Sequence, residues 1–183
     1  MTYDFFLFRP LAGLSVADSA AQIVGNEKIG VLTEADFIQQ KRRLFEELQR
    51  LNSEIEARAQ KGDPAIEFLD RENDILIHVS DNQIAVMLTV RAVNVNELWQ
   101  QLADYLALLH EVTGYAIYDA TAENEVLVDE EGHIELDTDH YDELFKGRDS
   151  VLKSGDPSSN RQLLMLLMFG LMSLPALFKF IQC

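Results

Sequence analysis

The residues best equipped for chemistry gather in one stretch, from Asp129 to His140, which reads DEEGHIELDTDH. Carboxylates and imidazoles can hold a divalent cation or move a proton. In an extended chain His133, Glu135 and Asp137 would share one face. The spacing matches neither the EF-hand loop nor the zinc-binding H-E-x-x-H pattern. We therefore predict no metal, no cofactor and no catalytic residue, although a small-substrate enzyme using His133 stays an alternative.

The same stretch suits recognition of a basic protein. Net charge is −16, and Lys179 is the only charge in residues 162–183, so residues 1–161 carry −17. Such a domain repels nucleic acid and attracts basic partners. An acidic surface that only keeps the protein in solution is the plainer alternative. The predicted partner-binding residues are the carboxylates of Asp129, Glu130, Glu131, Glu135, Asp137 and Asp139.

Other catalytic signatures are absent from the sequence. It contains no G-x-x-x-x-G-K-[ST] or G-x-G-x-x-G phosphate loop and no G-x-S-x-G nucleophile elbow. Cys183 is the single cysteine, which excludes an intramolecular disulfide and a cysteine-based zinc site. His78 in an apolar run and His110 near the end of a helix are expected to have structural roles. We predict that the protein is not an enzyme.

A second exceptional segment runs from Leu163 to Ile181 and reads LLMLLMFGLMSLPALFKFI. As a helix its 19 residues would span roughly 28 Å, close to the thickness of the bilayer core. Its apolar residues cover every face, which is typical of a membrane span or of a helix buried in protein. The residues predicted to contact the membrane are Leu163, Leu164, Leu166, Leu167, Phe169, Leu171, Leu174, Leu177 and Phe178.

Basic residues before this segment predict its orientation. Lys146, Arg148, Lys153 and Arg161 precede it, whereas only Lys179 lies at its far end. The positive-inside rule then places the N-terminal domain in the cytoplasm and the anchor in the inner membrane. A helix that packs on the domain or on a second copy is the alternative.

The remaining chain predicts alternating strands and helices. Tyr3–Phe8 is short and aromatic, as strands are. Ser15 and Thr33 resemble N-caps of a short helix, 16–24, and of a long amphipathic helix ending near Gln60. Three strands at 66–70, 75–80 and 83–90 form a meander. A helix at 95–113 and strands at 115–119 and 126–128 follow.

This order predicts an α+β fold of the ferredoxin-like kind, in which two long helices cover one face of an antiparallel sheet. The predicted domain covers residues 1–136. Residues 137–161 would be a polar linker with a short helix, and residues 162–183 a hydrophobic C-terminal helix.

Two segments carry a family resemblance. MTYDFFLF at the start and LLHEVTGYAIYDATAENEVL, where the second long helix joins the next strand, resemble segments of small bacterial proteins of polymorphic toxin systems, which act as immunity proteins. The resemblance implies a basic toxin as partner, and it transfers no site residue. The hydrophobic C-terminal segment departs from the soluble form of that family. The sequence thus predicts a membrane-tethered acidic protein that neutralises a basic partner, with an adaptor or scaffold subunit of a membrane complex as the alternative.

Overall fold

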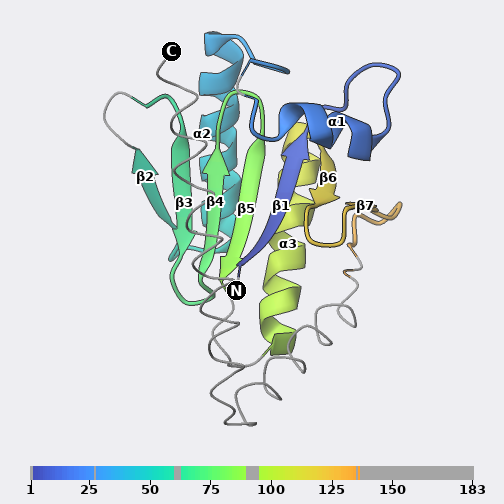
Figure 1. Cartoon of the computed structure of the whole chain (residues 1–183). Coiled ribbons are helices and arrows are strands. Elements are labelled where there is room, and N and C mark those ends of the chain that lie inside the picture. Colours follow the sequence, from blue (N-terminus) through green and yellow to red (C-terminus); the bar gives the residue numbers. More distant parts are fainter. Residues whose placement is uncertain (1, 27, 60–62, 90–94, 135, 137–183) are drawn as a thin grey trace, which may run out of the picture. The chain divides into compact units, whose positions relative to one another are not determined.

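The computed structural model describes residues 2–26, 28–59, 63–89, 95–134 and 136, which belong to a compact unit from Met1 to Leu136. Within these residues, seven strands form one sheet in the order β2-β3-β4-β5-β1-β6-β7, and every neighbouring pair is antiparallel. Three helices accompany the sheet (Figure 1). The predicted α+β fold is confirmed.

Most of the strands and helices follow from a local sequence pattern. The strands are β1 (Thr2–Phe8), β2 (Glu56–Ala59), β3 (Ile66–Asp70), β4 (Ile75–Val79), β5 (Ile84–Thr89), β6 (Ala116–Asp119) and β7 (Asn124–Val126). The helices are α1 (Val16–Ile23), α2 (Glu34–Leu51) and α3 (Val95–Thr113). Ser15 and Thr33 cap α1 and α2, because their side-chain oxygens accept hydrogen bonds from the backbone N–H of Asp18 and Asp36.

Strand β1 lies in the interior of the sheet, between β5 and β6. Phe5 pairs with Val86 of β5 on one side and with Asp119 of β6 on the other. Because β5 and β6 both run antiparallel to β1, they run parallel to each other and are joined by α3. The alternation of the strand residues sends Tyr3, Phe5 and Leu7 to one face and Phe6 and Phe8 to the other.

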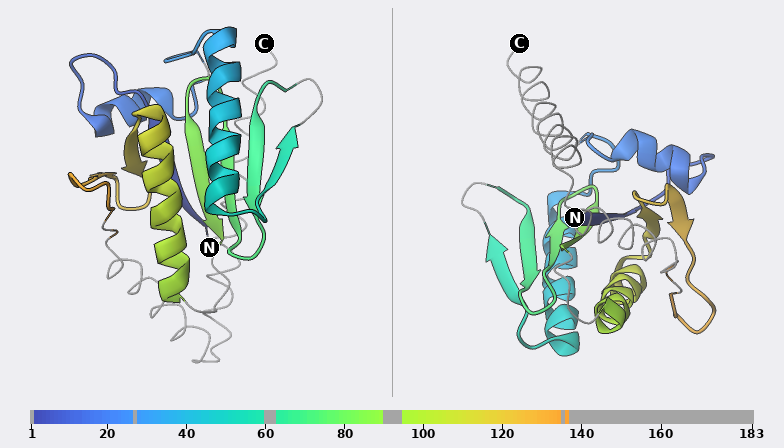
Figure 2. Two further views of the ribbon diagram at one scale, coloured as in Figure 1. Left: turned by 180° about the vertical axis from the view of Figure 1, so that it is seen from behind. Right: turned by 60° about the horizontal axis from the view of Figure 1, so that its bottom comes forward.

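Helices α2 and α3 lie side by side on one face of the sheet (Figure 2). This arrangement confirms the prediction that two long helices cover one face. The largest fully buried side chains include Tyr3, Phe5, Leu7, Leu44, Leu48, Phe68, Ile75, Ile77 and Tyr105. Burial of a side chain of this size contributes about 2 kcal/mol to stability. Helix α1 packs on the opposite face, where Ala20 and Ile23 contact Phe8.

One buried carboxylate joins three parts of the unit. Asp70, at the end of β3, is 3 % exposed. Its Oδ2 accepts hydrogen bonds from the Tyr105 hydroxyl of α3 at 2.9 Å, from Asn52 Nδ2 at 3.1 Å and from Asn73 Nδ2 at 2.8 Å. Its Oδ1 accepts the backbone N–H groups of Glu72 and Asn73. Buried acids are tolerated only when so many donors surround them.

The long helix is shorter than its sequence predicts. It ends at Leu51 rather than near Gln60, and residues 56–59 instead form β2. The helix ends at Asn52, whose N–H makes the last helical hydrogen bond, to Leu48 O at 2.9 Å, and whose own backbone is extended with φ of −141° and ψ of 106°. Its Oδ1 then accepts the N–H of Glu54 at 2.9 Å and turns the chain away from the helix. Pairing of β2 with β3 then outweighs the helix propensity of the following residues.

The prediction of a transmembrane, tail-anchored protein is wrong for the part of the chain that the structure describes. None of its helices has both the length and the apolar character that a membrane span requires. The described helices α2 and α3 carry charged residues along one side. The residues predicted to contact the membrane, between Leu163 and Phe178, lie outside the described ranges.

Candidate functional site

The described part of the predicted acidic site is a tight loop after β7. Val128 and Ile134 form an antiparallel bridge, and the five residues between them make the turn. Asp129 organises this turn. Its Oδ1 accepts the backbone N–H of Glu131 at 2.9 Å and that of His133 at 2.8 Å, while its own N–H bonds to His133 O at 3.0 Å. Gly132 takes the positive φ of 86° that closes the loop.

Three of the four exposed ionisable side chains of this loop lie close together. His133 Nδ1 lies 3.4 Å from Asp129 Oδ2 and 3.6 Å from Glu131 Oε2. The hydrogen bond from the His133 backbone N–H, helped by that from Glu131, holds the pKa of Asp129 below its ordinary value. The three groups could together ligate a divalent cation. All three are exposed, so water would compete strongly with them for the ion.

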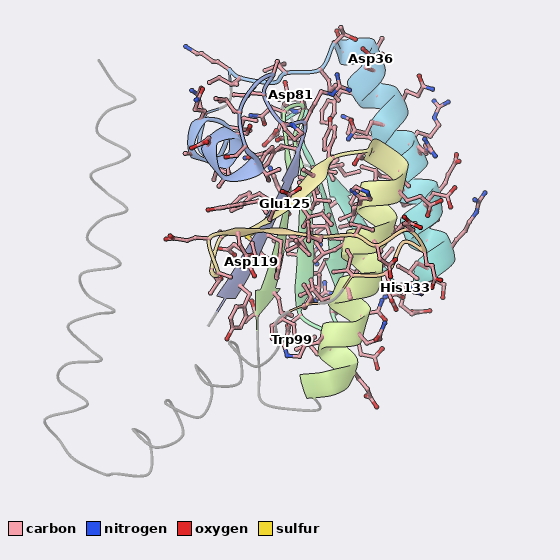
Figure 3. The ribbon with its side chains drawn as sticks, turned by 90° about the vertical axis from the view of Figure 1, so that its right-hand side faces the viewer. Asp36, Asp81, Trp99, Asp119, Glu125 and His133 are labelled. Atoms are coloured by element: carbon pink, nitrogen blue, oxygen red, sulfur yellow. The ribbon has the colours of Figure 1, made fainter. Side chains whose placement is uncertain are left out.

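Two further exposed carboxylates lie at the start of the edge strand that precedes this loop. Glu123 precedes β7 and Glu125 lies on it, and both are exposed. Figure 3 views the unit from the side of β7 and labels Glu125 and His133 on it. We call the exposed carboxylates of Glu123, Glu125, Asp129, Glu130 and Glu131 the acidic strip.

The sequence-predicted residues divide into two groups. Asp129, Glu130 and Glu131 lie on the exposed loop as expected for surface residues, whereas Glu135, Asp137 and Asp139 lie outside the described residues. The turn brings His133 to Asp129 and Glu131, whereas the extended face that it was expected to share with Glu135 and Asp137 involves residues outside the described ranges. Sequence reasoning missed Glu123 and Glu125, although the alternating E-N-E pattern before a predicted strand is a usable signal.

The carboxylates of the acidic strip have fewer cationic partners than the carboxylate at the opposite edge of the sheet. At β2, Glu56 bonds to Arg71 at 2.6 Å and to Arg58 at 3.1 Å, which lowers the pKa of Glu56. Among the described residues, the ion-pair partner of these five carboxylates is the single imidazole of His133. The strip therefore keeps most of its negative charge for an external partner.

The other histidines contact the scaffold. His110 Nδ1 lies 2.7 Å from Tyr115 O, which ties the end of α3 to the start of β6. His78 on β4 is half-buried, with its Nδ1 3.8 Å from Glu67 Oε1 on β3. Both contacts agree with the structural roles predicted for these residues.

Neither a protein-family model nor a curated protein sequence matches this chain.

Proposed function

We propose that this protein is a non-enzymatic binding protein that neutralises a basic protein partner through the acidic strip. The observation that carries this proposal is the set of exposed carboxylates along β7 and the 129–133 loop, whose cation partner among the described residues is His133. Opposite charges on two proteins steer their encounter and set the register in which they dock.

The shape of the strip supports recognition of a protein surface. Its residues come from an edge strand and from a loop that Asp129 holds in one conformation by hydrogen bonds. A preorganised loop loses little conformational entropy on binding. The resemblance of the N-terminal segment and of the α3–β7 segment to immunity proteins supports a toxin as the basic partner, with occlusion of the toxin's cationic surface as the mode of neutralisation.

The test compares two double variants that remove equal charge. Glu130→Gln with Glu131→Gln alters the strip, whereas Glu46→Gln with Glu54→Gln alters exposed carboxylates elsewhere. Binding to a decalysine peptide is measured by calorimetry at several salt concentrations. We expect the strip variant to bind about fivefold more weakly at low salt, and its affinity to depend less on salt.

Equal weakening by the control variant would show that net charge alone attracts the peptide, and it would contradict a specific strip. Affinity that does not change with salt would contradict the proposal altogether. If the gene beside that of this protein encodes a basic toxin, the toxin replaces the peptide in the binding experiment. The second readout is then whether co-expression of this protein restores the growth of cells that produce the toxin.

The finer description of the fold is also a proposal. We infer that α2, α3 and the strands β4-β5-β1-β6 form a ferredoxin-like core, because β1 lies between two parallel strands joined by a helix. The strands β2, β3 and β7 then extend the sheet at its two edges. In this description the acidic strip belongs to an added edge, where sequence can change without disturbing the core.

A further inference from the structure

A hollow of about 380 Å³ lies between the first half of α2, the end of α3 and the segments that follow β1 and precede β6. Its polar lining includes Arg9, Asp36, Gln39, Gln40, Arg43 and Tyr115. A volume of this size falls in the range of small-molecule sites. Figure 3 labels Asp36 at one end of α2, well away from His133 of the acidic loop.

Helical periodicity places the α2 residues on one side of the helix. Gln39 and Gln40 each lie three or four residues from Asp36 on one side and from Arg43 on the other, so the four side chains share one side of α2 and line the same hollow. Arg43 Nη1 donates a hydrogen bond to Val112 O at the end of α3, 3.3 Å away. This contact holds one guanidinium at the rim and leaves its remaining N–H groups available.

The charge of this hollow is opposite to that of the protein. The chain carries a net −16, yet two arginines line the hollow, and neither forms an ion pair with a carboxylate among the described residues. Asp36 is the acid of the lining, and it already accepts a hydrogen bond from the Thr33 hydroxyl at 2.6 Å as part of the helix cap. Arg9 and Arg43 therefore keep their positive charge available to a ligand.

Neutral donors add to the two arginines. The Tyr115 hydroxyl donates to Gln40 Oε1 at 3.4 Å, a long hydrogen bond, and Gln40 Nε2 is buried with no acceptor in the described residues. Burial raises the pKa of Tyr115, whereas the hydrogen bond with Gln40 and then the charge of Arg9 act against this shift. The hollow thus combines guanidinium and amide donors with a phenol oxygen, and a buried donor without a partner, such as Gln40 Nε2, is costly.

We propose that this hollow binds a small organic anion whose phosphate or carboxylate group is held between Arg9 and Arg43. Planar guanidinium groups match both oxyanions in paired, charge-assisted hydrogen bonds. The Gln40 amide and the Tyr115 hydroxyl lie beside this position and bond to the remainder of the ligand. The site is independent of the acidic strip, which attracts cations.

The experiment titrates the full chain with inorganic phosphate, with succinate and with sodium chloride at matched ionic strength, and follows backbone amide signals by NMR. At about pH 8 phosphate carries its second charge. We expect saturable shifts with a millimolar or lower dissociation constant, centred on residues 36–43 and 112–115. The dissociation constants of phosphate and succinate are then compared. The anion with the lower constant shows whether the site prefers a phosphate or a carboxylate group.

Paired variants separate this site from a general charge effect. Arg9→Gln and Arg43→Gln should each weaken binding about tenfold. Arg43→Lys keeps the positive charge but loses the paired N–H donors of the guanidinium, so it should weaken binding less. Asp36→Asn should strengthen binding while keeping the cap. Two control variants on α2 lie outside the hollow. Arg42→Gln removes one positive charge, as Arg43→Gln does, and Glu46→Gln removes one negative charge, as Asp36→Asn does, and both should leave the affinity unchanged.

Three results would overturn the proposal. The first is the same weak, unsaturable shift with chloride as with the two oxyanions. The second is equal loss of affinity in Arg42→Gln and Arg43→Gln. The third is unchanged affinity in both Arg9→Gln and Arg43→Gln when circular dichroism shows that the variants are folded.

Discussion

At the scale of single residues, Tyr105 links the two long helices to the hairpin between β3 and β4. Its hydroxyl donates to Asp70 and accepts from Asn52 Nδ2 at 2.8 Å. Tyr105→Phe leaves Asn52 with one acceptor fewer and Asp70 with one donor fewer. We expect a loss of about 1–2 kcal/mol in the free energy of unfolding, measured with urea.

Tyr118→Phe is the matched control, because Tyr118 is partly exposed in the cluster around α1. It should change stability by less than about 0.5 kcal/mol. Equal losses in the two variants would show that the Asp70 network does not stabilise the fold beyond ring packing.

The same tyrosine predicts how stability depends on alkaline pH. Burial is the main cause that raises the pKa of Tyr105 above its ordinary value of 10.0. Above that pH the unfolded chain loses a proton that the folded protein retains, so the stability contributed by the protonated hydroxyl decreases as pH rises. Urea unfolding between about pH 9 and pH 11 should show a decline that is shallower in Tyr105→Phe. Parallel declines would contradict this role.

The pKa values of Asp4 and Asp129 should lie on opposite sides of 3.8, the ordinary pKa of an aspartate. Desolvation by burial raises the pKa of Asp4 in the middle of the sheet, whereas backbone N–H groups lower that of Asp129. NMR titration of the side-chain carboxyl carbons should therefore place Asp129 below Asp4. The reverse order would contradict the loop geometry described above.

Residue identity alone predicted the exposed carboxylates but not their arrangement. Asp129, Glu130 and Glu131 were expected to be available to a partner, and all are exposed. The contact of His133 with Asp129 depends on a turn that Gly132 closes and that alternation along an extended strand does not describe. The hollow between α2 and α3 was not predicted, because Arg9 and Arg43 meet there only through the packing of distant segments.

At the scale of elements, caps and periodic apolar residues predicted most boundaries. The structure places α3 at Val95–Thr113 and the meander at β3, β4 and β5, as the sequence indicates. Strand β7 begins earlier than expected, since Asp119 Oδ1 accepts the N–H groups of Thr121 and Ala122 and tightens the preceding turn. Strand β2 could not be predicted, because its residues favour a helix and only its pairing with β3 selects a strand.

The junction between α3 and β6 depends on one glycine. Gly114 has φ of 67°, and its N–H bonds to His110 O at 2.7 Å. No atom lies within 4 Å of the position that a Cβ would occupy, so the cost of Gly114→Ala comes from the backbone. We expect a loss of about 1 kcal/mol in unfolding free energy by urea titration. Gly114→Asn should lose less, because asparagine tolerates this conformation, and equal losses would contradict a backbone cause.

At the scale of the whole molecule, the large negative net charge destabilises the folded state. A net charge of −16 repels itself, and salt reduces this repulsion. We expect the urea midpoint to rise when NaCl increases from about 10 mM to about 500 mM at pH 7. The rise should be much smaller near the isoelectric point of about 4.5. An equal rise at both pH values would show that the salt acts by another route.

The central position of β1 has a consequence for the order of folding. Its pairing partners β5 and β6 follow it by most of the length of the unit, so β1 is synthesised long before either of them. Contacts this distant along the chain slow folding. During synthesis the apolar segment YDFFLF must remain unpaired until β5 and β6 have left the ribosome. A strand that lies between two others in the finished sheet is therefore without either of its pairing partners while most of the unit is synthesised.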